Sequence, residues 1–288
     1  MPPQPYNLPA LILAAGRGAR MRPLTDHTPK PLLAVAGRPM IEWHLLALAA
    51  AGVRQVVINC AWLEDQIPAA LGDGSRWGLT IRYSLEGRDH GGALETAGGI
   101  KNALPLLLDG ARAAMQGCFW LLSGDIVAPG FGFEAGQAQQ FADGADDAHL
   151  WLVPNPDFHQ AGDFALQAGR VVRPPAGQDR PLTYANLALV RPALVQAVRA
   201  GQHAALGPLL FDSAAAGRLA GTLWAGPWHN VGTAAQLEAL NKEALNAEAL
   251  NTEALNTAAP HAVAAHPTAP QPAASGMAAP SAALRQQA

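Results

Sequence analysis

Short apolar segments alternate with amphipathic stretches along most of the chain, and this alternation limits the possible folds more than any other feature. The first apolar segment, Ala10–Ala15, runs directly into glycine, as a buried strand often does. The further strand candidates are Gln55–Asn59, Leu79–Ser84, Cys118–Leu122, Leu150–Val153 and Leu187–Val190. The helix candidates between them are Met40–Ala51, Trp62–Leu71 and Ala97–Leu108. This order predicts an α/β fold, with a mixed, mainly parallel sheet flanked by helices.

Ligands of such sheets gather at the carboxyl ends of the strands. We therefore expect the functional residues to lie just after Ala15, Asn59, Ser84 and Leu122.

The composition changes near Asn241. Glu-Ala-Leu-Asn units then repeat every five residues, a spacing that advances about 140° around a helix and puts successive leucines on different faces. From Thr257 the chain is rich in Ala and Pro. We predict a single domain over residues 1–240 and a low-complexity, disordered tail over residues 241–288.

The charges nearly balance, with 19 Lys and Arg against 22 Asp and Glu, which argues against non-specific binding to nucleic acid. No segment reaches the roughly 20 apolar residues of a membrane helix, so we expect a cytoplasmic protein. Cys60 and Cys118 have apolar neighbours and are expected to be buried thiols.

The segment after the first strand is rich in Gly and Pro and suits phosphate. Its exposed backbone N–H groups would face phosphate oxygens, and Arg20 and Lys30 flank a stretch stiffened by prolines. The dinucleotide fingerprint fails because Met21 stands at the third glycine position, and no Walker motif follows. The alternative is an ordinary turn with two solvated cations.

The string from Leu13 to Leu32, Leu-Ala-Ala-Gly-x-Gly-x-Arg-Met-x-Pro-Leu-Thr followed by Pro-Lys-Pro-Leu, resembles the signature of the sugar-1-phosphate nucleotidyltransferases. The resemblance covers about Leu8 to Leu240 and implies the Rossmann-like fold of the nucleotide-diphospho-sugar transferases. These enzymes join a nucleoside triphosphate to a sugar 1-phosphate and release pyrophosphate. The resemblance assigns Gly16, Gly18, Ala19 and Arg20 to the triphosphate. It assigns Lys30 to the charge on the phosphates and the leaving pyrophosphate.

The same resemblance implies a Mg²⁺ site. Asp125 follows an apolar strand and matches a metal ligand, and Ser123 would line the nucleotide site. The second ligand of the family is usually Asp, but Asn230 stands there and brings an oxygen without a charge. Trp228 and His229 beside it are expected to be packing residues.

Base and sugar contacts are less strongly indicated. Glu86 would contact uracil from a glycine-containing, mobile loop, or else be a solvated loop charge. Gly98 and Gly99 would leave room for a sugar or base, and Asp163 and Asn186 are sugar candidates. The lysine that many relatives place on the sugar phosphate is missing. Arg170 and Arg173 lie in that region of the chain, and the contact stays open.

Among the subfamilies, the uridylyltransferases of cell-wall recycling that act on N-acetylmuramate α-1-phosphate are most similar. The strings that carry this likeness are Asn59–Leu63, Leu71–Ser75, Leu94–Ile100, Asn155-Pro156, Gly162–Phe164 and Gly232-Thr233. The expected reaction consumes UTP and produces UDP-N-acetylmuramate. A mannose-1-phosphate guanylyltransferase, or another sugar-1-phosphate nucleotidyltransferase, is the alternative. A catalytically weak nucleotide-sugar-binding protein is a third reading, which Asn230 favours and the presence of Arg20, Lys30 and Asp125 opposes.

Overall fold

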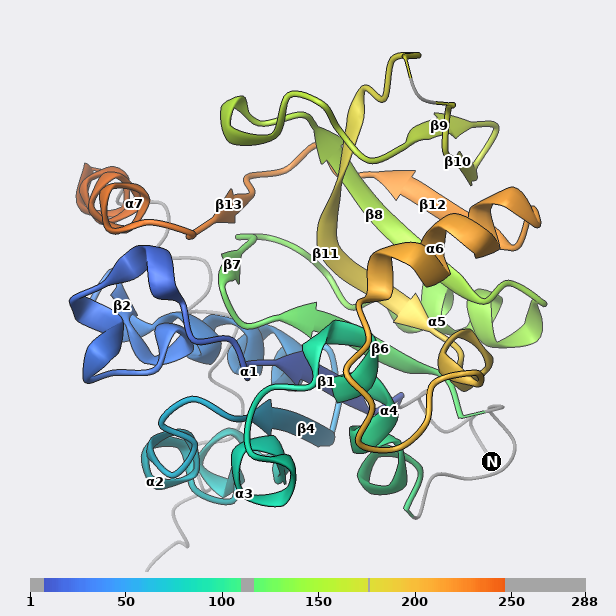
Figure 1. Cartoon of the computed structure of the whole chain (residues 1–288). Helices are drawn as coiled ribbons and strands as arrows, with labels where there is room; N and C mark the ends of the chain where they lie inside the picture. Colours follow the sequence, from blue (N-terminus) through green and yellow to red (C-terminus); the bar gives the residue numbers. More distant parts are fainter. Residues whose placement is uncertain (1–7, 110–116, 176, 247–288) are drawn as a thin grey trace, which may run out of the picture. The chain divides into compact units, whose positions relative to one another are not determined.

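A nine-stranded mixed sheet organises the molecule (Figure 1). The computed structural model describes residues 8–109, 117–175 and 177–246, all within the first of two compact units, 1–258 and 259–288. The strand order is β5-β4-β1-β6-β11-β8-β12-β10-β9. The bounds of these strands are β1 Ala10–Leu13, β4 Gln55–Cys60, β5 Thr80–Leu85, β6 Phe119–Ser123, β8 Ala148–Pro154, β9 Ala165–Gln167, β10 Arg170–Val172, β11 Leu182–Val190 and β12 Leu219–Leu223.

Strands β5, β4, β1 and β6 are parallel, and β11 pairs antiparallel with both β6 and β8. Strand β12 is parallel to β8, whereas β10 runs against β12 and β9. The predicted mixed, mainly parallel sheet is confirmed. All six predicted strands form, and the pattern missed β9, β10 and β12 at the far edge.

The strands bury both faces because neighbouring side chains point to opposite sides. Ala10 and Ile12 of β1 join one apolar cluster, and Leu11 joins the other. Helices α1 (Met40–Ala50), α2 (Gln66–Leu71) and α5 (Ala135–Asp143) pack on the first face. Helices α4 (Glu95–Leu108) and α6 (Leu206–Ala215) pack on the second. Helices on both faces match the expected architecture.

The predicted helices α1 and α4 form nearly over their expected ranges. Helix α2 is shorter than expected because the chain turns over residues 62–65, with Leu63 at a left-handed φ of 49°. The segment expected to be a mobile loop after Ser84 instead forms the end of β5 and the short helix α3 (Glu86–His90).

A third apolar cluster lies where the last helix, α7 (Ala234–Asn246), meets the start of the chain. Leu237 and Leu240 pack there with Met21 and Met40. Asn241 bonds the backbone of residues 34 and 36, so the ordered helix continues past residue 240, where we predicted the domain to end. The tail predicted to be disordered lies, from residue 247 onward, outside the described residues.

Small elements complete the described chain. The short strands are β2 Ala34–Val35, β3 Arg38–Pro39, β7 Ile126–Val127 and β13 His229–Asn230. The 3₁₀ turns are Ala19–Met21, Leu24–Asp26, Lys30–Leu32, Ser75–Trp77, Asp157–His159 and Pro192–Val195. Cys60 and Cys118 are buried free thiols, as predicted. Within the described ranges, no helix has the length and apolarity needed to cross a bilayer.

Candidate active site

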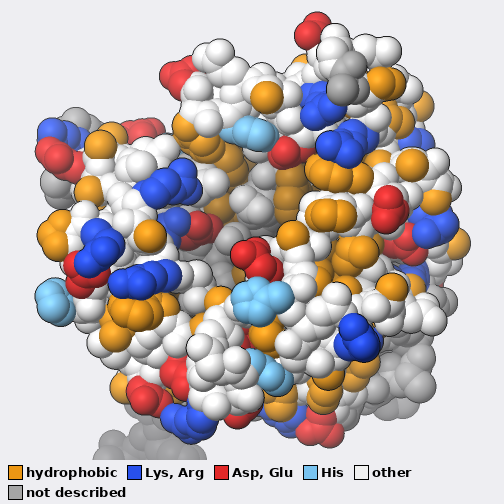
Figure 2. Space-filling model, viewed as in Figure 1, with side chains coloured by type: hydrophobic (Ala, Val, Ile, Leu, Met, Phe, Trp, Pro, Cys, Tyr) orange, Lys and Arg blue, Asp and Glu red, His pale blue; other side chains and the backbone are white. Residues whose placement is uncertain are grey.

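The carboxyl ends of β1, β4, β5 and β6 meet at one edge of the sheet, since these strands are parallel and adjacent. The face seen in Figure 2 is hollowed in its middle, and charged side chains of both signs stand around the hollow. Three of the segments marked by the sequence, after β1, β5 and β6, carry its predicted nucleotide residues and the predicted metal residue Asp125. Their contacts define the candidate site.

The phosphate-loop backbone is held by side chains that face it. Gly18 has a left-handed φ of 66°, and a Cβ there would lie 3.2 Å from the Lys30 Cβ. Thr25 donates its hydroxyl to the Gly18 carbonyl at 2.9 Å, and Trp62 donates its indole N–H to the Thr25 carbonyl at 2.7 Å. Arg17 lies over the Trp62 ring. Trp62, which we did not single out as a site residue, thus braces the loop that carries Arg20 and Lys30.

Lys30 and Asp125 form an ion pair although they are 95 positions apart in sequence. The Lys30 ammonium lies 2.5 Å from Asp125 Oδ2, and the Ser123 hydroxyl donates to Asp125 Oδ1 at 2.7 Å. The Lys30 side chain is only 10% exposed and that of Asp125 27%, so the pair faces a partly sheltered space. The structure brings together three of the predicted nucleotide and metal residues.

Asn230 joins the same group. Strand β13 pairs with β7 so that Asn230 opposes Ile126, and the Val231 N–H donates to the Asp125 carbonyl. The Arg20 guanidinium lies 3.1 Å from where a Cβ on Gly232 would stand. The two predicted metal ligands therefore sit on neighbouring chain segments, with both predicted phosphate cations close by.

Glu86 differs from the expected base contact. Its side chain is fully buried, Oε1 accepts from the Asn59 amide at 2.7 Å, and Oε2 accepts from the Leu94 N–H at 2.8 Å. Asn59 in turn accepts from the Ala14 N–H. Burial raises the pKa of Glu86, and these two hydrogen bonds partly offset the rise. Glu86 thus connects the ends of β1, β4 and β5 to the start of α4. Each of its two carboxylate oxygens accepts a hydrogen bond from the protein.

The space expected beside Gly98 and Gly99 is filled by protein. A Cβ on Gly98 would lie 2.2 Å from the Gln202 carbonyl oxygen, and one on Gly99 would lie 2.6 Å from the Asn59 amide nitrogen. The Ala204 carbonyl accepts the N–H groups of Ala97 and Gly98. Because these glycines have no side chains, other segments of the protein pack closely against the first turn of α4. The open space that we predicted there for a ligand is therefore absent.

The sugar candidates lie on or beside β11. Asp163 accepts the Tyr184 N–H at 3.0 Å, and its other oxygen lies 3.0 Å from His159 Nε2. Asn186 has a left-handed φ of 58° where the β11–β8 register shifts. Its neighbour Leu187 pairs with Leu122 of β6, so Asn186 lies near the strand end that carries Ser123.

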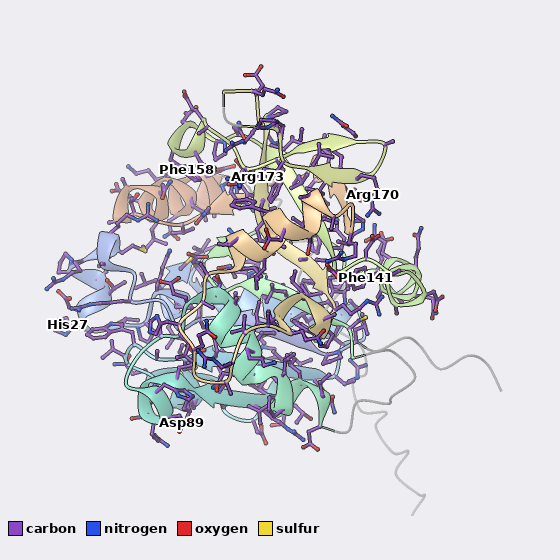
Figure 3. All side chains as sticks on the ribbon, turned by 45° about the vertical axis from the view of Figure 1, so that its right-hand side comes forward. His27, Asp89, Phe141, Phe158, Arg170 and Arg173 are labelled. Carbon is purple, nitrogen blue, oxygen red and sulfur yellow. The ribbon has the colours of Figure 1, made fainter. Side chains whose placement is uncertain are left out.

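Arg170 and Arg173, which lie in the region of the missing lysine and are labelled in Figure 3, both contact other side chains of the protein. Arg170 makes a bidentate pair with Asp146, at 2.9 and 2.6 Å. Arg173 lies over the Phe211 ring at 3.4 Å. The sugar-phosphate contact is therefore not explained by either residue as it stands.

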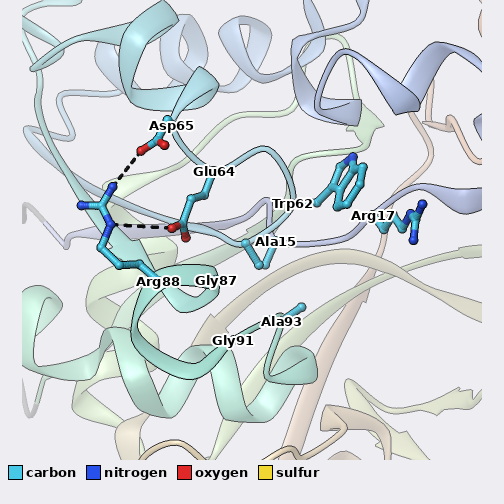
Figure 4. Close-up of a pocket in the computed structure, with 11 residues that line it drawn as sticks. Ala15, Arg17, Trp62, Glu64, Asp65, Gly87, Arg88, Gly91 and Ala93 are labelled. Atoms are coloured by element: carbon cyan, nitrogen blue, oxygen red, sulfur yellow. Dashed lines mark hydrogen bonds and ion pairs between the residues drawn. The ribbon is translucent and has the colours of Figure 1, made fainter.

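A cavity of about 450 Å³ opens beside the phosphate loop (Figure 4). Ala15 and Arg17 line one side, Trp62 and Glu64 another, and the backbone after α3 a third. One oxygen of Glu64 is buried without a hydrogen-bond partner, and Arg88 lies 3.8 Å from the other. The cavity adjoins the loop of Gly16 and Gly18 and has polar and aromatic walls.

His44 connects the sheet face to the site. Its Nε2 lies 3.1 Å from the Ser123 carbonyl, and burial lowers its pKa to about 4. The ring is therefore neutral near pH 7 and donates Nε2–H to that carbonyl. We did not single out His44 beforehand, because a histidine within an apolar helix gives no sign of the strand end that it meets.

Comparison with known proteins agrees with this geometry. Residues 9–157 match the family model described as "Nucleotidyl transferase". The N-acetylmuramate alpha-1-phosphate uridylyltransferase of Neisseria meningitidis serogroup B is 45% identical over 229 residues, which span 80% of this chain and 95% of that enzyme. The enzyme of the same name from Caulobacter vibrioides is 36% identical, over 77% of this chain and 91% of that one.

A solved structure shares the fold. The crystal structure of a putative glucose-1-phosphate thymidylyltransferase from Bacillus anthracis, in complex with a sucrose, superposes with a TM-score of 0.68. It covers 83% of this chain and 95% of the other, at 18% sequence identity. At that identity the likeness supports the fold alone.

Proposed function

Since the chain belongs to the nucleotidyl transferase family, we propose that it transfers the uridylyl group of UTP to N-acetylmuramate α-1-phosphate, with release of pyrophosphate. The observation that carries this proposal is the 45% identity over 95% of a relative that bears this activity in its name. A nucleoside triphosphate and a sugar 1-phosphate are the substrates that the family implies. UTP and the muramyl sugar are the specific pair proposed here.

The reaction is an in-line displacement at the α-phosphorus, in which a sugar-phosphate oxygen attacks and pyrophosphate leaves. Catalysis of this kind depends on alignment and charge neutralisation more than on covalent chemistry. We assign Arg20 and Lys30 to the charge that develops on the leaving pyrophosphate. The loop of Gly16, Gly18 and Ala19 holds the triphosphate, and the cavity beside Trp62 receives the base. Ser123 fixes the Asp125 carboxylate.

Mg²⁺ fits the donor set. Asp125 and Asn230 present oxygens from neighbouring segments, and Mg²⁺ prefers oxygen ligands. Within the described ranges, no group of three His, Cys, Asp or Glu side chains could hold a metal ion. Mg²⁺ needs only one or two protein ligands when substrate phosphates supply the others. When bound, the ion would neutralise phosphate charge. Lys30 occupies Asp125 Oδ2 in this structure, and it would exchange that carboxylate for phosphate oxygens when the triphosphate binds.

On the sugar side we assign Asp163 and Asn186 to hydroxyl groups of the acceptor. Gly98 is a weaker assignment, because the Gln202 backbone fills the space over it. Glu86 acts in this proposal as a positioning residue for the loop around the base, since its side chain is fully buried and is bonded to Asn59 and Leu94.

A pyrophosphate-release assay tests the function. UTP, GTP, dTTP and ATP are each combined with the 1-phosphates of N-acetylmuramate, mannose and glucose, in the presence of Mg²⁺. The highest kcat/KM is expected for UTP with N-acetylmuramate 1-phosphate. Faster turnover of GTP with mannose 1-phosphate would assign the protein as a guanylyltransferase instead. No turnover of any pair would favour a nucleotide-sugar-binding protein.

A further inference from the structure

Phe158 is an exposed aromatic side chain next to the candidate sugar residues. It is 52% exposed, and no other aromatic side chain of the described ranges stands among the exposed large hydrophobic residues. Its ring stacks with that of Trp228, with centroids 6.5 Å apart and planes inclined by 27°. Figure 3 labels Phe158, which lies on the 3₁₀ turn Asp157–His159 between β8 and β9. We call Phe158 and Trp228 the aromatic platform.

The platform is held in place from both sides. Asn155 fixes the coil, since its amide donates to the Gln160 and Arg180 carbonyls and its oxygen accepts from Thr183. Trp228 donates its indole N–H to the Ala185 carbonyl at 2.9 Å. More than half of the Phe158 side chain is exposed while its segment is held by these hydrogen bonds, so the ring is accessible to a ligand.

The platform lies between the proposed metal and sugar residues. Trp228 is two positions before Asn230, and its partner Ala185 directly precedes Asn186. His159, which follows Phe158, contacts Asp163. An acceptor with its phosphate toward Lys30 and its hydroxyls toward Asp163 and Asn186 would therefore extend along the platform.

The geometry points to the aromatic platform as the subsite for the acyl and ether substituents of the acceptor sugar, which makes Phe158 a specificity-determining residue. This inference rests on the proposed function. N-Acetylmuramate carries an acetamido group and a lactyl ether, whose methyl groups offer apolar surface that glucose and mannose lack. Aromatic rings pack well against these methyl groups, while the acetamido amide and the lactyl carboxylate would point away from the rings toward water. Contacts to the C4 and C6 hydroxyls, which all three sugars share, would not separate these sugars.

Steady-state kinetics of Phe158→Ala test the inference. KM for N-acetylmuramate 1-phosphate should rise about tenfold, the usual effect of losing a small apolar contact. KM for UTP and kcat at saturating sugar should stay within about twofold, because the platform does not meet the nucleotide. Phe158→Tyr, which keeps the ring, should restore KM.

Phe211→Ala is the matched control. Phe211 is likewise a member of an aromatic pair, with Phe164 at 5.7 Å, but it is partly buried and packs against the cluster on the opposite face from the one that Trp228 contacts. Its loss should leave KM for the sugar unchanged. An unchanged KM in Phe158→Ala, an equal rise in KM for UTP, or a failure of Phe158→Tyr to restore it would overturn the platform. The proposed function itself is tested separately, on the wild-type protein. If the wild type does not turn over N-acetylmuramate 1-phosphate, the proposed function is wrong.

Discussion

At the scale of single residues, the chemistry centres on how Asp125 divides its two oxygens. One accepts from Ser123 and the other from Lys30, so the carboxylate is oriented before any ligand arrives. Preorganised charge of this kind lowers the reorganisation needed during the reaction. A neutral side chain of the same size at position 125 would keep the shape but lose the negative charge that pairs with Lys30.

Asp125→Asn should lower kcat by a factor that corresponds to about 2–4 kcal/mol of transition-state stabilisation. The amide has nearly the same shape, so the melting temperature should change little. Rates at saturating Mg²⁺ provide the measurement, and Asp146→Asn is the control because the Asp146 carboxylate is paired with a different cation, Arg170. Near-normal kcat in Asp125→Asn would remove Asp125 from the metal and phosphate chemistry.

Asn230→Asp should shift the Mg²⁺ dependence of the initial rate to lower concentrations without abolishing activity. Both side chains present an oxygen at the same reach, and the carboxylate adds a charge that attracts the cation. The gain should appear only with Mg²⁺ present, because the same charge repels the nucleotide phosphates. Superimposable titrations of the two proteins would show that Asn230 is a turn residue and not a ligand.

The sequence was most informative where a residue's position depends on its own short segment. Arg20, Lys30 and Asp125 stand in local strings that end strands or stiffen a loop; Lys30 and Asp125 meet as such strings predict, and Arg20 lies beside Gly232. The burial of Glu86 could not be predicted, because it depends on Asn59 from another strand and on the N–H of Leu94. No local pattern specifies those two partners.

At the scale of elements, the start of α4 shows how a loop distant in sequence completes a helix. The first N–H groups of a helix lack partners within it. The Ala204 carbonyl accepts two of them, and the Leu206 N–H returns a bond to the Thr96 hydroxyl. Gly98 is required where the two chains cross, because the Gln202 carbonyl occupies the space of a Cβ.

Gly98→Ala should therefore destabilise the protein by about 1–3 kcal/mol, as overpacking usually does. Gly136→Ala in helix α5 is the matched control, because a Cβ there meets nothing within 4 Å. That change should stabilise by about 0.5–1 kcal/mol through helix propensity alone. Denaturant unfolding measures the free energy of unfolding of both variants. Equal changes in that free energy would show that the backbone around Gln202 moves to make room for a Cβ at position 98.

Strand prediction succeeded from β5 through β8 in the sheet order and failed for the three strands beyond β8. Central strands such as β6 are continuous apolar runs and are recognisable from sequence alone. Strand β12 reads Leu-Ala-Gly-Thr-Leu, which lacks both a continuous run and a clear alternation. It becomes a strand because β8 pairs along its whole length.

At the scale of the whole molecule, the two halves of the sheet place different parts of the site. The parallel strands β5, β4, β1 and β6 end at the phosphate loop and Asp125, whereas β11 and the coil after β8 carry the sugar candidates. The two halves join where β6 pairs with β11. Below this junction His44 of α1 bonds the Ser123 carbonyl, so the packing of one sheet face supports the proposed metal residue.

His44 also links folding to pH. Burial lowers its pKa from 6.5 to about 4 in the folded protein. Between these values the unfolded chain binds the proton and the folded protein does not, so stability rises with pH across this window. The stabilisation is fully present above about pH 6.5 and is lost as the pH falls toward 4. Burial raises the pKa of Glu86 and has the opposite sign, because the folded form then keeps its proton longer.

His44→Gln isolates the histidine from all other groups, because His149 and Glu86 titrate in both proteins. Gln keeps an N–H that reaches the Ser123 carbonyl but does not titrate. The free energy of unfolding of the wild type should fall by up to about 3 kcal/mol more than that of the variant between pH 6.5 and 4. Urea unfolding at several pH values across this window measures the difference. Parallel pH profiles would mean that the folded protein protonates His44 as readily as the unfolded chain does, and that water reaches the ring beneath Ser123.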